Sequence, residues 1–211
     1  MKAGLCLAAL LISTAAFAQS SLPGPYIVDL RGAMSGAPGG ELFYPAVTAA
    51  AEVLAPQRAF GFAAGAHIYP FHLGVAHVGL GVDLMRTRGT ASSLSNVDAA
   101  MSVTTLAPQL SFNFGTREGW SYLSGGFGMA RTRAKVDVPA TTTTSTTSPP
   151  VTVTTPASTS SRERQSPAIN IGGGARWFLR ERVAVGFDVR FHRLTNPSKQ
   201  IVGLSVGLSL R

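Results

Sequence analysis

The chain has 211 residues, which is enough for one ordinary domain and too few for two. Its formal net charge is +8 at pH 7, but no basic helix or RNA-binding motif accompanies that charge, so we expect anionic lipid as a partner and no nucleic acid. The only cysteine is Cys6, which excludes a disulfide framework.

The N-terminus is typical of a secretory signal peptide. Lys2 supplies a positive charge, Leu5 to Ile12 form an apolar stretch, and Ala16 to Ala18 match the small-x-small cleavage pattern. The apolar stretch is shorter than the roughly 20 residues that a spanning helix needs. We therefore expect a signal peptide at residues 1–18 and a single mature domain at residues 19–211.

Eight segments of the mature chain alternate with the two-residue period of a β-strand. In one of them, Phe187 and Val189 share a face, while Asp188 and Arg190 share the opposite face. In chain order the segments are Tyr26–Met34, Arg58–Tyr69, Ala76–Leu84, Leu106–Phe114, Trp120–Lys135, Ala168–Leu179, Val183–Leu194 and Val202–Leu210.

The polar faces of these segments hold mostly Gly, Ser, Ala and Asn rather than the Lys, Glu and Thr of a solvated sheet. Small polar residues suit the crowded lumen of a narrow barrel, and the bulky apolar face suits lipid. The pattern predicts an all-β fold, an eight-stranded antiparallel transmembrane β-barrel. The alternative is a secreted lipocalin-like barrel, in which the apolar face would point inward.

Short and long connections alternate, as in barrels with short periplasmic turns and long extracellular loops. We expect short turns near Pro70–Gly74, Gly115–Gly119 and Arg180–Arg182. We expect long loops at Ser35–Gln57, Gly89–Ser102 and Val136–Gln165, with Thr195–Lys199 as a short exception. The loop at about 136–165 is rich in Thr, Ser and Pro, which indicates a solvated surface segment.

Glycine-studded strands, such as the segment from Tyr122 to Gly128, resemble the outer-membrane protein β-barrel domain family of OmpA transmembrane-domain type. The resemblance covers Gln19 to Arg211. It implies eight strands, an outer-membrane location, insertion by the outer-membrane assembly machinery, and a role in structural support, adhesion or weak permeation. The chain departs from the family in lacking a terminal aromatic residue and in placing Pro108 within a strand, where a bulge would accommodate it.

Charged residues on the lumen face balance in sign. A narrow interior of low dielectric favours ion pairs over free charges, so we expect a paired polar plug. A gate that blocks or passes ions is the alternative. The residues of this expected network are Asp29, Arg31, Asp83, Arg176, Asp188 and Arg190.

The histidines do not form a convincing catalytic or metal site. His67 and His77 would be cross-strand neighbours in a symmetric hairpin, but no third ligand accompanies them, so no metal or cofactor is expected. His192 also faces the lumen, and His72 falls in a periplasmic turn. No serine, base and carboxylate meet on the lipid face, so the chain is not expected to be an enzyme.

Basic residues gather at the outer strand ends, where arginine forks would meet lipopolysaccharide phosphates; generic loop charge that serves solubility is the alternative. We expect a monomeric, non-catalytic structural or surface-interaction protein that contacts outer-membrane lipid, with lipopolysaccharide as the candidate ligand. A small-solute porin or gated narrow channel is the alternative. The expected phosphate contacts are Arg86, Arg88, Arg131, Arg133 and Lys135.

Overall fold

A computed structural model describes residues 25–39, 43–45, 53–93, 96–116, 118–146 and 150–211. The expected signal peptide at residues 1–18 lies outside the described residues. Within them, no helix is long and apolar enough to cross a membrane.

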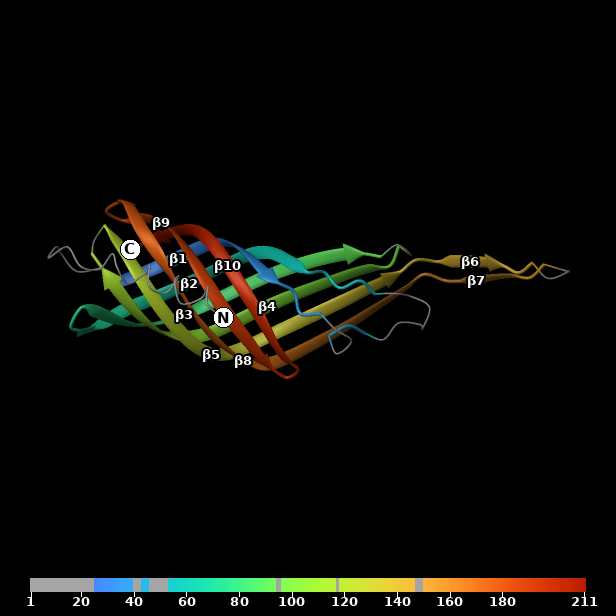
Figure 1. Cartoon of the computed structure of the whole chain (residues 1–211), viewed down its shortest axis with the longest axis horizontal. Coiled ribbons are helices and arrows are strands. Elements are labelled where there is room, and N and C mark those ends of the chain that lie inside the picture. The colour runs from blue at the N-terminus through green and yellow to red at the C-terminus, as the bar shows by residue number, and fades with distance from the viewer. Residues whose placement is uncertain (1–24, 40–42, 46–52, 94–95, 117, 147–149) are drawn as a thin grey trace, which may run out of the picture.

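Eight antiparallel strands close into a barrel in the order β1-β10-β9-β8-β5-β4-β3-β2 (Figure 1). The ring closes where β1 pairs with β10, with Val28 opposite Leu210. The predicted eight-stranded antiparallel fold is confirmed. The barrel strands are β1 (Tyr26–Gly36), β2 (Arg58–Leu73), β3 (Ala76–Ser92), β4 (Asp98–Gly115), β5 (Gly119–Val138), β8 (Ser158–Arg180), β9 (Val183–Thr195) and β10 (Ser198–Leu210).

The barrel is polar inside and apolar outside. In β1, Asp29 and Arg31 are buried, while the intervening Leu30 is 66% exposed on the outer surface. Because successive side chains of a strand point to opposite faces, this alternation gives each barrel strand at least one buried polar side chain in the lumen. The outer surface is a band of bulky apolar side chains, which requires lipid around it.

Four adjacent strands extend beyond the rest of the barrel at its outer end. β3, β4, β5 and β8 have 17, 18, 20 and 23 residues, against 11 in β1, 16 in β2 and 13 in both β9 and β10. β6 (Thr141–Thr144) and β7 (Thr152–Thr155) form a two-stranded ribbon that projects farther still (Figure 1). We call the four-stranded projection the outer sheet.

Two expected loops are therefore wrong in their bounds. The predicted loop at Gly89–Ser102 is mostly strand, and the connection between β3 and β4 spans only residues 93–97. The predicted loop at Val136–Gln165 is also mostly strand, since β5 and β8 pair as far as Val138 opposite Ser158. The Thr and Ser tracts that predict loop form strand instead, because β-branched threonine favours strands.

The side-chain pattern inverts along the outer sheet. In β5, Met129 is apolar and exposed on the outer surface, and one step farther the exposed residues are Arg131 and Arg133. The inward residues there, Ala130 and Ala134, are apolar and buried. One continuous strand thus changes from a lipid-facing to a water-facing pattern at this level, which marks the outer limit of the apolar band.

The expected bulge at Pro108 is absent. Pairing of β4 with β5 is interrupted after Leu106 and resumes at Gln109 opposite Gly126 in the same register, so the missing proline N–H is accommodated without an inserted residue. A register shift occurs instead in β2, between Ile68 and Phe71. This shift moves His72 onto the lumen face.

Candidate functional site

The structure brings all six lumen charges together in one buried network. At its periplasmic end, Arg176 donates to Asp29 through Nε and Nη2, at 2.9 and 2.6 Å. The Ser209 hydroxyl donates to the same carboxylate. The Arg176 guanidinium also lies 3.9 Å from the centre of the Tyr122 ring, a cation–π contact.

The other two carboxylates share the remaining two arginines. Asp83 accepts a 2.7 Å hydrogen bond from Arg31 and lies 3.8 Å from Arg190. Asp188 forms ion pairs with Arg190 at 3.0 Å and with Arg31 at 3.4 Å, and accepts a 2.8 Å bond from the Tyr122 hydroxyl. Each carboxylate therefore has at least one arginine within ion-pair distance.

Uncharged side chains complete the network. Arg190 donates to Gln109 and Asn170, each at 2.9 Å through Nη1, and to Ser124 at 2.9 Å through Nη2. Charge balance in the sequence did not point to these partners. Their inward positions on strands facing Arg190 are the only sequence signal that could have found them. Beside the network, a cavity of about 10 Å³ has room for roughly one water molecule.

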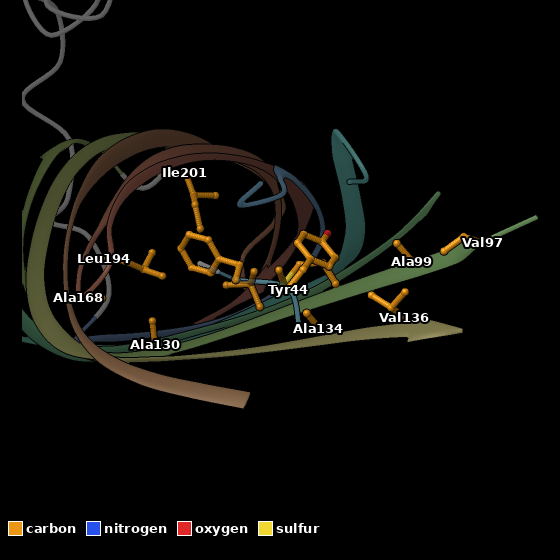
Figure 2. Close-up of a cluster of buried hydrophobic side chains, with 12 residues drawn as sticks. Tyr44, Val97, Ala99, Ala130, Ala134, Val136, Ala168, Leu194 and Ile201 are labelled. Carbon is orange, nitrogen blue, oxygen red and sulfur yellow. The ribbon is translucent and has the colours of Figure 1, made fainter. Parts of the chain in front are cut away.

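The outer side of the network is covered by an apolar cluster (Figure 2). Phe43 and Tyr44, from the connection between β1 and β2, pack against inward side chains of the outer sheet and of the β9–β10 end, and Figure 2 shows Tyr44 among them. Burial raises the pKa of the Tyr44 hydroxyl to about 12. The cluster consists of Phe43, Tyr44, Val97, Ala99, Met101, Val103, Ala130, Ala134, Val136, Ala168, Leu194 and Ile201.

An aromatic cluster closes the periplasmic end. Trp120 stacks on Phe178 with ring centres 5.3 Å apart and meets the edge of Tyr69 at 5.6 Å. Ile27 packs with them, and the Arg211 guanidinium lies 3.9 Å from the centre of the Phe178 ring. The described lumen is thus filled in succession by aromatic, ionic and apolar side chains.

The expected histidine pair is wrong. His77 lies opposite His72, with ring centres 3.7 Å apart, whereas His67 lies opposite Gly81 and stacks on Tyr69. The register shift in β2 is the reason, because one extra residue moves His72 onto the lumen face. His72 is also part of β2 rather than of the turn. His192 is buried in the lumen, as expected of an inward residue.

The five expected phosphate contacts all lie on the outward surface of the outer sheet, which we call the basic outer face. Strand register arranges its arginines in two transverse rows. The row at the edge of the apolar band is Phe62, Arg86, Thr104, Arg131 and Gln165. The next row outward is Phe60, Arg88, Ser102, Arg133 and Glu163, and Lys135 lies one row beyond it.

The row below the first is wholly apolar, so the arginines begin directly at the edge of the lipid-facing band. That row is Ala64, Leu84, Leu106, Met129 and Pro167. Beside the arginines of β3, Phe60 and Phe62 are 62% and 43% exposed. Aromatic side chains thus flank the cations on the same surface, a feature that the charge count did not reveal.

Two of the five cations already have carboxylate partners. Arg131 pairs with Glu163 and Lys135 pairs with Asp137, each at 2.7 Å. The hydrogen bond from Arg131 holds the pKa of Glu163 below its ordinary value. Among the described residues, Arg86, Arg88 and Arg133 form no ion pair, so these three are the available cations of the basic outer face.

Comparison with known proteins agrees with this architecture. The model of a family described as "Outer membrane protein beta-barrel domain" matches residues 4–209. A comparison with curated protein sequences gives no significant match.

Solved structures of small barrels share the fold at low identity. The chain is 12% identical to Ail, the attachment invasion locus protein of Yersinia pestis, with a TM-score of 0.55 over 90% of this chain and 99% of that one. A structure of Ail with the heparin analogue sucrose octasulfate gives 11% identity, 88% and 95% coverage, and a TM-score of 0.51. Neisserial surface protein A gives 15% identity, 89% and 97% coverage, and a TM-score of 0.51.

Proposed function

The chain belongs to the outer membrane protein β-barrel domain family, and from that premise we propose that it is a non-catalytic surface protein that binds lipopolysaccharide phosphates through its basic outer face. The protein lies in the bacterial outer membrane, and its apolar band faces the lipid. Lipopolysaccharide forms the outer leaflet there, so its phosphates are the anions nearest to the outer edge of that band.

The observation that carries the proposal is the change of the outward side chains of the outer sheet from apolar to charged at its first arginine row. Arg86 and Arg131 lie one row above Leu84 and Met129, so their guanidinium groups stand at the headgroup level. One strand, β4, separates β3 from β5, so two inter-strand spacings place the arginines of β3 about 10 Å from those of β5 at the backbone. Within each of these two strands the two arginines are two residues apart, which places them about 7 Å from each other along the strand.

Arginine suits this role because its planar fork donates two hydrogen bonds to one phosphate. A single exposed pair contributes only about 0–1 kcal/mol, so binding requires the cluster rather than any one residue. Thr104 and Ser102 add hydroxyl groups between the arginines of β3 and those of β5. Phe60 and Phe62 offer apolar surface beside Arg88 and Arg86 for the lipid part of the same molecule.

Native mass spectrometry of the detergent-solubilised barrel tests the proposal. We expect the protein to retain phosphorylated lipid A better than dephosphorylated lipid A. Replacing Arg86, Arg88, Arg131 and Arg133 with Gln should abolish the preference and leave the barrel folded, since all four side chains are exposed. Equal retention of the two lipids by the native protein would contradict the proposal.

The packed lumen argues against the alternative of a small-solute porin. Eight strands enclose a space that side chains can fill, and here the ionic network lies between two apolar clusters. We expect planar-bilayer recordings to show low or flickering conductance. Replacing Arg190 with Gln and Asp188 with Asn should raise it, because the pair holds the centre of the network. A large, steady conductance from the native protein would favour the porin instead.

A further inference from the structure

The cross-strand histidine pair lies at the periplasmic end, on the β2–β3 hairpin and away from the basic outer face. Figure 1 shows the turn between β2 and β3 at the end of the molecule opposite to β6 and β7. His72 and His77 lie directly opposite each other, three residues or fewer from that turn, with their ring centres 3.7 Å apart. The rings belong to neighbouring strands, so the backbone ladder fixes their separation.

The pair exists because of the register shift in β2. Ile68 pairs with Leu80, but Phe71 pairs with Val78, so β2 contains one more residue than β3 across this stretch. Without the extra residue, His72 would point to the outer surface, since a one-residue slip moves every side chain to the opposite face. Bulges of this kind commonly re-aim a side chain at a functional position.

His77 is buried without a hydrogen-bond partner. Its side chain is 7% exposed, and neither Nδ1 nor Nε2 has a partner among the described protein atoms. Its neighbour on the other side, Asn113, is fully buried, and the amide Nδ2 is likewise unpartnered. His67 and His192 are unpartnered in the same way, so what distinguishes His77 is a second histidine directly opposite it at the mouth of the barrel.

We propose that His72 and His77 bind a divalent late transition-metal ion at the periplasmic mouth of the barrel, with Asn113 as a third, oxygen ligand. Neutral imidazole suits copper, zinc and nickel in particular. For both rings to form nitrogen–metal bonds of about 2.0–2.1 Å, their centres would have to move apart from the present 3.7 Å. His72 is exposed, so its side chain can make this movement. Asn113 lies opposite His77, and its Oδ1, which accepts a 3.2 Å hydrogen bond from the Ser111 hydroxyl, would exchange that bond for the metal ion.

The test uses the mature barrel without a histidine tag, titrated with Cu²⁺ and observed by electron paramagnetic resonance. We expect one Cu²⁺ per barrel, with hyperfine splitting from two imidazole nitrogens. His72→Gln should weaken binding by more than about tenfold, because even the outer-shell partners of a ligand contribute 10–100-fold. His72 is exposed, so this change leaves the barrel folded.

His67→Gln is the matched control, since it removes a lumen histidine that does not contact the pair. It should leave the two-nitrogen signal unchanged, and heat-dependent gel mobility would report the folded fraction of each variant. A His72→Gln protein that keeps the native copper affinity would overturn the site. So would a native spectrum with a single nitrogen ligand.

Discussion

Asp29→Ala should lower the free energy of unfolding of the inserted barrel by about 3–5 kcal/mol, the usual effect of removing one partner of a buried ion pair. The Asp29 carboxylate accepts two hydrogen bonds from Arg176 and one from Ser209. Without it, Arg176 would keep a buried positive charge with no carboxylate in hydrogen-bond contact. Urea unfolding in lipid bilayers measures the change.

Two controls separate the ion pair from general damage to the lumen. Ser209→Ala removes one neutral donor and should cost only about 1 kcal/mol. Adding Arg176→Met to Asp29→Ala removes the stranded charge and should recover part of the lost stability, because the second change eliminates an uncompensated cation. An Asp29→Ala barrel as stable as the native one would show that water, rather than Arg176, solvates this carboxylate.

Phe187→Arg should destabilise the barrel by about 2–4 kcal/mol, the cost of a cation at the midplane of the bilayer. Phe187 points outward from β9 between Ala175 on β8 and Val206 on β10, halfway along the apolar row of its strand. It also contacts Trp177, with ring centres 5.9 Å apart. The same bilayer unfolding experiment measures the loss.

Thr104→Arg is the matched control, since it adds the same side chain to the same outer surface at the level of the first arginine row. Near the interface an arginine costs about 0–1 kcal/mol. A substitution of the neighbouring inward residue, Gly186, could not serve as the control, because a Cβ there would lie 2.6 Å from the Ala175 carbonyl oxygen. Equal losses for Phe187→Arg and Thr104→Arg would contradict the assignment of this surface to lipid.

Residue alternation was enough to predict the strands and their faces within the membrane. The period of two alone separates Phe187 from Asp188, and lipid outside the barrel makes the larger apolar side chains face outward. The same alternation continues through Met101 and Val103, but there the apolar residues face inward. The expected long loops therefore begin too early, because the inverted phase and the Thr-rich tracts do not match the lipid-facing pattern of the strands.

The sequence did not allow the pairing register of neighbouring strands to be predicted. An inserted residue between Ile68 and Phe71 leaves no clear mark in the alternation, so the histidine facing His77 was assigned wrongly. The charge network was easier to predict, since inward carboxylates and arginines in a narrow barrel must pair. Gln109 reaches Arg190 across the lumen from a strand that does not adjoin β9, and the pairing of Arg131 with Glu163 depends on how far β5 and β8 extend, so neither contact could be predicted without the register.

We propose that the location of the cations on the basic outer face, rather than the net charge of the barrel, determines binding of lipopolysaccharide phosphates. Two double variants, compared in the same native mass spectrometry measurement, test this most directly. Arg86→Gln with Arg88→Gln removes two cations from the basic outer face, and Arg180→Gln with Arg182→Gln removes two exposed cations from the periplasmic turn. We expect the first pair to reduce retention of phosphorylated lipid A strongly and the second to leave it unchanged. Equal losses for the two pairs would contradict a specific outer site.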